Sequence, residues 1–455
     1  MVVVFVLVAV AVLALLAAVH RYVWRRLIGD TTRRGGVARR AGTVAAFVLP
    51  LLSVGALVSG RAGFPFRLQQ VLAWPGYLWL AALLYLTLAL LLGEAVRPLL
   101  RRTLARRAGP AAAAPEHTDR PAEVPAGVHA DPAGAVVGEH TAQAVGTPPE
   151  TTPGPGGDTA PGGTRTGLAE PPEADAPAVA DPSRRLFVAR AVGGAAALAG
   201  LGTVGHGTYG VLRGPRVKRV TVPLAGLPRS AHRFRIAVVS DIHLGPILGR
   251  AHTRRIVDTI NATGSDLVAV VGDLVDGSVA DLGSAAEPLA GLEARHGSFF
   301  VTGNHEYFSG AAQWVDHVRE LGLHPLENAR VEIAGFDLAG VNDVAGESEG
   351  QGPDFARALG DRDRSRASVL LAHQPVVIDD AVEYGVGLQL SGHTHGGQLW
   401  PGNLLAELAN PTVAGLERYG DTQLYVSRGA GAWGPPVRVG APSDITVVEL
   451  ASPQA

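Results

Sequence analysis

Five short runs of histidine, aspartate and asparagine recur in the second half of the chain, each directly after an apolar stretch. The runs are SDIH (240–243), GDLVD (272–276), GNHE (303–306), LAH (371–373) and GHTH (392–395). The apolar stretches have strand composition, so the polar side chains are expected at the carboxyl ends of several strands, where they can converge on one crevice. Imidazole, carboxylate and amide oxygen without thiolate suit divalent Mn, Fe, Zn, Ni or Co rather than Ca or Mg.

The runs contain seven candidate metal ligands. They are Asp241, His243, Asp273, Asn304, His373, His393 and His395. Seven ligands exceed the needs of one tetrahedral ion and suit two divalent ions that share a bridging carboxylate. Two such ions can clamp the attacking and leaving oxygens of a phosphoryl displacement and lower the pKa of a bridging water. Each run alone has a simpler explanation, such as helix capping or a surface loop with incidental histidines, so the prediction depends on the ordered series.

The composition limits the function classes that need to be considered. Among 455 residues, 47% are hydrophobic and the mean hydropathy is +0.19, which favours membrane segments. The formal net charge is −2, and no nucleic-acid partner is expected. The chain contains no cysteine, which excludes disulfides, zinc–thiolate sites and thiol catalysis.

Residues 1–107 are predicted to form a membrane region with three transmembrane helices. Uncharged apolar stretches cover 2–19, 43–60 and 71–93. Arginines cluster between the first two stretches and after the third, which places both clusters in the cytoplasm. The first stretch lacks the basic start of a cleaved signal peptide. A transporter is a less favoured alternative to an anchor, because no charged residue lies in these stretches apart from Glu94 at the end of the third.

Two segments connect the membrane region to the C-terminal part. Residues 108–182 are rich in Ala, Pro, Gly and Thr, which predicts a disordered linker. Residues 183–212 begin with SRRLF, which resembles a twin-arginine export motif, although the motif is internal and Val188-Ala189 stands where Leu-Lys is usual. The alternative is a fourth transmembrane helix. Both interpretations carry the chain across the membrane, so the C-terminal domain is expected outside the cytoplasm and the protein in the cell membrane as a multi-pass protein.

Residues 219–452 have an α/β pattern, and the ordered series of runs resembles the calcineurin-like metallophosphoesterase superfamily, in particular its membrane-anchored or exported bacterial branch. The resemblance extends over about 232–450 and includes SRGAGAWGPPVR (427–438), which looks like a pocket loop of that branch. It implies a four-layer α/β/β/α sandwich with a dinuclear metal centre.

The resemblance also implies roles for individual residues. The first metal ion would be held by Asp241, His243 and His395, and Asp273 would bridge. The second ion would be held by Asn304, His373 and His393. His305 would be the general acid, and Asp276 would orient it.

One departure from the superfamily concerns the phosphate-binding cation. Its protein serine/threonine phosphatases carry an arginine soon after the second aspartate, whereas this chain has Asp276-Gly277-Ser278. This difference argues against a phosphoprotein phosphatase. Arg428 is the candidate for substrate binding, and a local salt bridge is the alternative explanation of this arginine.

The expected function is a membrane-anchored phosphoesterase that hydrolyses a phosphomonoester or phosphodiester by attack of a metal-bridging hydroxide. Its partners would be the membrane and a phosphoester substrate, with a lipid-linked or cell-envelope substrate suggested by the anchor. Two alternatives stay open: a pyrophosphatase acting on a nucleotide-linked glycolipid of the UDP-diacylglucosamine type, and a non-catalytic metal-binding membrane module.

Overall fold

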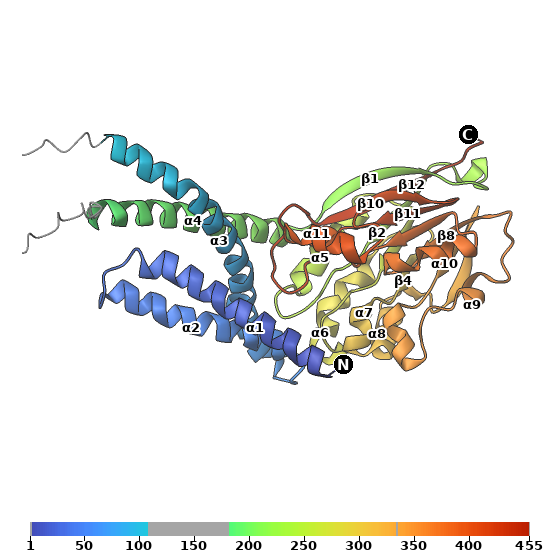
Figure 1. Cartoon of the computed structure of the whole chain (residues 1–455). Coiled ribbons are helices and arrows are strands. Elements are labelled where there is room, and N and C mark those ends of the chain that lie inside the picture. The colour runs from blue at the N-terminus through green and yellow to red at the C-terminus, as the bar shows by residue number, and fades with distance from the viewer. Residues whose placement is uncertain (1, 108–181, 334, 455) are drawn as a thin grey trace, which may run out of the picture. The chain divides into compact units, whose positions relative to one another are not determined.

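The computed structural model describes residues 2–107, 182–333 and 335–454 (Figure 1). These residues form an N-terminal helical region and a C-terminal α/β domain. The predicted linker, residues 108–182, lies outside the described residues except for Pro182, which begins a helix.

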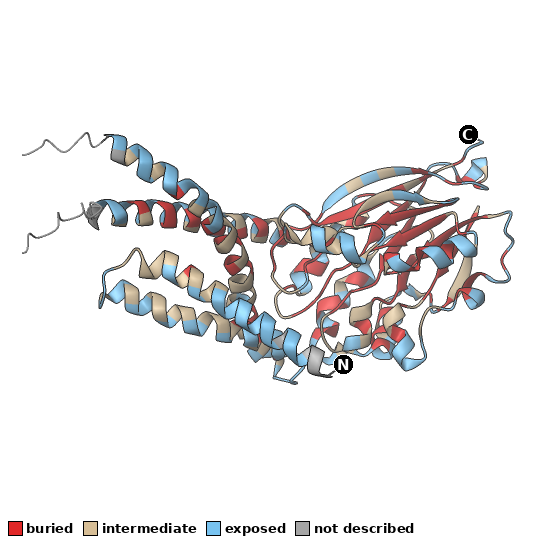
Figure 2. Ribbon diagram, viewed as in Figure 1, coloured by how far each residue is buried: buried red, intermediate tan, exposed pale blue. Residues whose placement is uncertain are grey.

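The helical region contains four long helices. They are α1 (Val2–Trp24), α2 (Val37–Val58), α3 (Phe66–Arg107) and α4 (Pro182–Leu212). All four are long and apolar enough to span a membrane, in agreement with the predicted stretches. Most residues of α1 and α2 are exposed although their side chains are apolar (Figure 2), as expected for helices whose solvent is lipid. The twin-arginine interpretation of α4 stays a prediction.

Ion pairs connect the arginine-rich ends of these helices. Arg26, which follows α1, lies 2.9 Å from Glu94 of α3, and Arg97 lies 3.3 Å from the same carboxylate. Arg190 of α4 donates to the backbone oxygen of Thr31 at 3.1 Å. These residues therefore define one end of the helical region, which we call the arginine end.

The middle of α3 and the C-terminal part of α4 contact the α/β domain. The hydroxyl of Tyr85 donates to the backbone oxygen of Trp400 at 3.0 Å, and the backbone N–H of Arg438 donates to the oxygen of Gly207 at 3.3 Å. The helix α4 ends at Leu212, and the first strand of the domain begins at Arg216. Three residues therefore connect the last candidate membrane helix to the domain.

Two six-stranded sheets form the centre of the α/β domain. The first sheet has the order β1-β12-β2-β3-β4-β5, and the second has the order β10-β11-β9-β8-β7-β6. The strands are β1 (Arg216–Pro223), β2 (Phe234–Val239), β3 (Leu267–Val271), β4 (Ser298–Val301), β5 (His324–Pro325), β6 (Ala329–Ile333), β7 (Phe336–Gly340), β8 (Ala367–Leu371), β9 (Leu388–Ser391), β10 (Gly415–Tyr419), β11 (Thr422–Val426) and β12 (Asp444–Ala451). Most neighbours are parallel, and the antiparallel pairs are β12–β2, β10–β11 and β6–β7.

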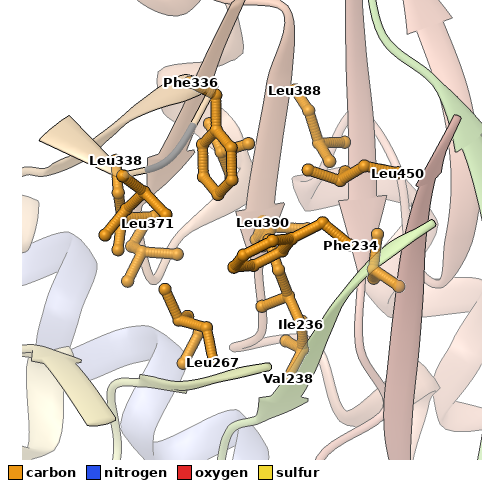
Figure 3. Close-up of a cluster of buried hydrophobic side chains, with 14 of the residues drawn as sticks. Phe234, Ile236, Val238, Leu267, Phe336, Leu338, Leu371, Leu388, Leu390 and Leu450 are labelled. Carbon is orange, nitrogen blue, oxygen red and sulfur yellow. The ribbon is translucent and has the colours of Figure 1, made fainter. Parts of the chain in front are cut away.

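The main hydrophobic core lies between the two sheets. In β2, Ile236 and Val238 point into this core, whereas Ala237 and Val239 belong to the cluster on the other face of the sheet, as the two-residue period of a strand requires. Leu388 and Leu390 of β9 belong to the same core (Figure 3). Because both faces of the central strands are buried, the sequences of these strands are continuous apolar runs.

Short helices cover the outer faces of the two sheets. The first sheet packs against α5 (Arg250–Asn261), α6 (Val279–Ala286) and α8 (Ala311–Glu320), and the second against α9 (Phe355–Leu359) and α10 (Ile378–Glu383). The helices α7 (Asn304–Ser309) and α11 (Gly402–Ala409) follow two of the polar runs. This arrangement confirms the predicted four-layer α/β/β/α sandwich. The strands β1, β5, β6 and β10 were not predicted, because their residues lack a continuous apolar run.

Candidate metal centre

All seven predicted ligands lie in the segments that directly follow strands of the two sheets, and Asn304 is the first residue of α7. The first sheet supplies the loops after β2, β3 and β4, and the second supplies the loops after β8 and β9. These five strands are parallel to their neighbours in that set, so within each sheet their carboxyl ends lie at one edge. The two sheets stack so that these edges meet, and the side chains converge as predicted.

Asp241, His243 and His395 form one compact group of buried side chains. Their ligand atoms all lie within 4.8 Å of one another. Nε2 of His395 lies 3.0 Å from Nε2 of His243 and 3.3 Å from Oδ1 of Asp241. The group joins the two sheets, because His395 follows β9 and the other two residues follow β2.

Asp273, His373 and His393 form a second group with the same spacing of 4.8 Å or less. Oδ2 of Asp273 lies 3.1 Å from Nε2 of His373 and 3.8 Å from Nε2 of His243. Asp273 therefore lies between the two groups. The side-chain oxygen of Asn304 lies 3.0 Å from Nδ1 of His393, which adds the amide to the second group.

The backbone at the site is held in an uncommon conformation. Eight described non-glycine residues have positive φ, and five of them are predicted ligands: Asp241, His243, Asp273, His393 and His395. Such conformations cost free energy, cluster at functional sites and persist only where the surrounding structure enforces them. Gly392 adds a steric requirement, since a Cβ there would collide with the carboxylate of Asp241.

Comparisons with known proteins agree with this geometry. Residues 234–397, which include all seven predicted ligands, match the family model of calcineurin-like phosphoesterases. The chain is 39% identical over 256 residues to an uncharacterized metallophosphoesterase of Helicobacter pylori, covering 56% of this chain and 68% of that protein. The chain belongs to the calcineurin-like phosphoesterase family. The family generally uses divalent metal ions, and the two groups are its candidate ligands here.

Two other relatives match about half of this chain. An uncharacterized metallophosphoesterase of Aquifex aeolicus is 34% identical over 240 residues, which cover 52% of this chain and 91% of that protein. A transmembrane protein with a metallophosphoesterase domain from Danio rerio is 38% identical over 259 residues, which cover 54% of this chain. The match spans 59% of the length of the Danio rerio protein.

The hydrogen bonds around the imidazoles suit a metal site. Nδ1 of His373 donates to the backbone oxygen of Val271 at 2.9 Å, and Nδ1 of His243 donates to Asp276 at 2.9 Å. Each bond leaves Nε2 facing the carboxylates of the site, the arrangement that a metal-binding histidine adopts. The residues present therefore fit divalent cations.

Charges inside the phosphoesterase domain shift the pKa values of the histidines in opposite directions. Burial alone would lower the pKa of His243, but Asp276 and the other carboxylates raise it to about 9. Burial and the charge of His373 lower the pKa of His393 to about 4, and burial with His243 and Arg438 lowers that of His395 well below its usual value. His393 and His395 are thus neutral, the form that binds metal, whereas His243 must lose a proton to bind a cation.

Asp276 has two imidazole partners rather than the one expected from the sequence. Its Oδ1 lies 2.7 Å from Nδ1 of His305 and 2.9 Å from Nδ1 of His243. Burial alone would raise the pKa of Asp276, but these imidazoles lower it to about 2. One carboxylate oxygen therefore connects a predicted metal ligand to the predicted general acid.

Glu306 is a buried residue of the site to which the sequence analysis assigned no role. Its carboxylate accepts hydrogen bonds from the backbone N–H groups of Asp273 at 2.9 Å, Leu274 at 2.7 Å and Gly303 at 2.6 Å. It thereby joins the loop after β3 to the turn before α7. The signal was present in the GNHE run, where the glutamate directly follows the predicted general acid.

The loop 427–438 contributes two arginines with different surroundings. Arg438 is buried, and its guanidinium lies 3.0 Å from Nδ1 of His395 and donates to the backbone oxygen of the same residue. Arg428, the predicted substrate-binding residue, lies against Gly396 and lines a cavity of about 280 Å³. Among the described residues, no carboxylate forms an ion pair with Arg428, so the salt-bridge alternative has no partner there. The sequence analysis did not single out Arg438.

Proposed function

We propose that this protein is a membrane-anchored, metal-dependent phosphoester hydrolase with two divalent ions at one centre. The observation that carries the proposal is the pair of ligand groups, Asp241–His243–His395 and Asp273–His373–His393, with Asp273 between them. Asn304 would complete the second group. When bound, the two ions would supply Lewis acids for the phosphoryl oxygens and an acidified bridging water that attacks phosphorus.

The protein's own residues would position the substrate and supply a proton. His305 is partly exposed, with 16% of its side chain accessible, and its Nδ1 is held by Asp276. This contact directs Nε2 away from the carboxylate, where it can donate a proton to the leaving oxygen. The rings of Phe308 and Trp433 lie 5.5 and 5.9 Å from the His305 ring and are largely exposed. They form an apolar rim for the leaving group.

Arg428 would bind a non-bridging phosphate oxygen or a second phosphate. It faces the same cavity as Gly396, the residue after the ligand His395. A guanidinium without a carboxylate partner is a suitable donor to phosphate oxygens. A substrate with one phosphate or with a diphosphate bond is compatible with this position, and the assay must include both.

The phosphoesterase domain is proposed to face the side of the membrane opposite the arginine end. The arginines of that end favour the cytoplasm, and α4 contacts the domain at its other end. Reporter fusions after residues 107 and 220 test this topology. The expected result is a cytoplasmic signal for the first fusion and an extracytoplasmic signal for the second, and two cytoplasmic signals would refute it.

The hydrolase function is tested with the full chain in detergent after loading with Mn²⁺. The substrates are bis-p-nitrophenyl phosphate, p-nitrophenyl phosphate and a nucleotide diphosphate ester. The expected result is metal-dependent turnover that is lost in His305→Ala while the bound metal is retained. Metal binding without turnover of any substrate would support the non-catalytic module instead.

A further inference from the structure

The helix α11 exposes an apolar face that the packing of the domain does not use. Leu404, Leu405 and Leu408 are 55%, 72% and 85% exposed, and the preceding Trp400 is 54% exposed. No residue of this eight-residue helix is buried. A short helix is marginal without tertiary packing, and contiguous exposed apolar side chains mark an interaction site. The segment 400–409 therefore needs a partner.

The contacts of the neighbouring residues place this segment beside the membrane helices. Leu399 packs in the hydrophobic cluster that contains Leu86 of α3 and Val204 of α4. The hydroxyl of Tyr85 donates to the backbone oxygen of Trp400 at 3.0 Å. The segment thus begins on the surface of two candidate membrane spans.

The position of Gly207 along α4 gives the depth of this contact, because its backbone oxygen accepts from the N–H of Arg438 at 3.3 Å and the next residue, Val439, pairs with Leu399. Gly207 lies seventeen residues after Arg190, which belongs to the arginine end, so the two are about 26 Å apart along the helix axis. A bilayer core is about 30 Å thick. With Arg190 at one boundary, the contact beside Leu399 lies in the far half of the bilayer, close to its interface.

We propose that Trp400, Leu404, Leu405 and Leu408 form a membrane-contact surface whose partner is the lipid bilayer that holds α1–α4. An in-plane helix buries its apolar side chains below the headgroups, and tryptophan is enriched at this depth. Continuity with the spans favours lipid over a second protein, because the residues adjoining this surface already contact transmembrane helices.

This surface also adjoins the metal centre. Trp400, Asn403 and Glu407 line the cavity of about 280 Å³ that also contains Gly396 and Arg428. One side of α11 would therefore contact lipid while the other lines a cavity beside His395. Resting on the proposed hydrolase function, this arrangement assigns a phosphoester carried by a membrane lipid as the substrate class, because its phosphate can reach Arg428 while its chains stay in the bilayer.

The membrane contact is tested without reference to catalysis. Since the chain has no cysteine, Leu408→Cys provides a unique site for a nitroxide label in the full chain reconstituted in phosphatidylcholine vesicles. Val382→Cys, on the exposed side of α10, is the matched control. Power-saturation electron paramagnetic resonance is expected to show severalfold greater access of oxygen than of a nickel chelate at position 408 and the reverse at 382. Equal chelate access at both positions, or exclusion of both reagents at 408, would overturn the proposal, the latter in favour of a protein partner.

The substrate class is tested with the triple variant Leu404→Ser/Leu405→Ser/Leu408→Ser. We expect its rate on soluble bis-p-nitrophenyl phosphate to stay within twofold of the unmodified protein and its rate on phosphatidic acid in vesicles to fall at least fivefold. Equal vesicle rates would overturn the lipid-borne substrate. No turnover of either substrate by the unmodified protein would overturn the hydrolase function, whereas the label measurement still decides the membrane contact.

Discussion

Asp276 is the residue at which the structure makes the sharpest prediction about catalysis. Its Oδ1 accepts from both His243 and His305, and the imidazoles lower its pKa from 3.8 to about 2. This shift corresponds to a net stabilisation of the carboxylate of about 2 kcal/mol. In Asp276→Asn, the amide oxygen can still accept both hydrogen bonds, so the substitution removes the charge and retains the geometry.

We expect Asp276→Asn to lower kcat by about 10- to 100-fold, the loss typical of a residue that orients a metal ligand or a catalytic imidazole. The assay is steady-state hydrolysis of bis-p-nitrophenyl phosphate by the Mn²⁺-loaded full chain, with bound metal measured by mass spectrometry. Asp281→Asn is the matched control, because Asp281 lies nearby on α6, is exposed and pairs with Ser278. Its kcat should not change.

A double-mutant cycle separates the two imidazole partners of Asp276. If Asp276 acts through His305, Asp276→Asn adds nothing to His305→Ala, whereas action through His243 gives additive losses and reduced metal content. Retention of more than half of the kcat in Asp276→Asn, with metal content unchanged, would refute the electrostatic role derived from the structure.

Three further substitutions and one treatment test other parts of the site. Glu306→Gln should lower the free energy of unfolding by about 1–3 kcal/mol, because at least one of three buried N–H groups then faces an amide NH₂. Thermal unfolding measures this loss, and Glu320→Gln at an exposed position is the control. An unchanged melting temperature of Glu306→Gln would contradict the prediction. Removal of metal with EDTA should lower the melting temperature, and addition of Mn²⁺ should restore it. At a hundredfold excess of free Mn²⁺ over Kd, metal binding should raise the free energy of unfolding by about 2.7 kcal/mol. His373→Ala should weaken this response, and an equal response in both proteins would exclude His373 as a ligand. Arg428→Ala should raise KM about tenfold with metal content unchanged, as expected for a lost phosphate contact of about 1.4 kcal/mol. Arg418→Ala, at an exposed position of β10, is the control and should leave KM unchanged. An unchanged KM in Arg428→Ala would exclude Arg428 from the substrate-binding site.

The chemistry of the site was predictable from the sequence because local features carry it. The runs after β2, β3, β4, β8 and β9 identify the ligand types, and the apolar stretches before them identify buried strands. Since parallel strands place their carboxyl ends at one edge, convergence follows without knowledge of the strand order. The candidate membrane helices were predictable for a similar reason, because about twenty consecutive apolar residues are long enough as a helix to span the hydrocarbon core of a bilayer.

Other features depend on residues that meet only after the two sheets stack. His243 and His395 are separated by 152 residues and belong to different sheets, yet their Nε2 atoms lie 3.0 Å apart. Arg438 contacts His395. The GNHE run contains Glu306 but does not indicate that its carboxylate accepts from the backbone N–H group of Asp273, which lies 33 residues earlier in the chain. Asp276 shares one oxygen between two imidazoles, which the spacing GDLVD does not indicate.

The exposed face of α11 shows the same division most clearly. Leucines on one face of a short helix such as GNLLAELA usually pack against a hydrophobic core. Only the tertiary structure shows that these leucines face outward beside α3 and α4. The sequence by itself determined which residues can bind metal and which helices can enter a membrane. The tertiary structure decided which side chains meet and which apolar face stays uncovered, because both depend on contacts between segments far apart in the chain.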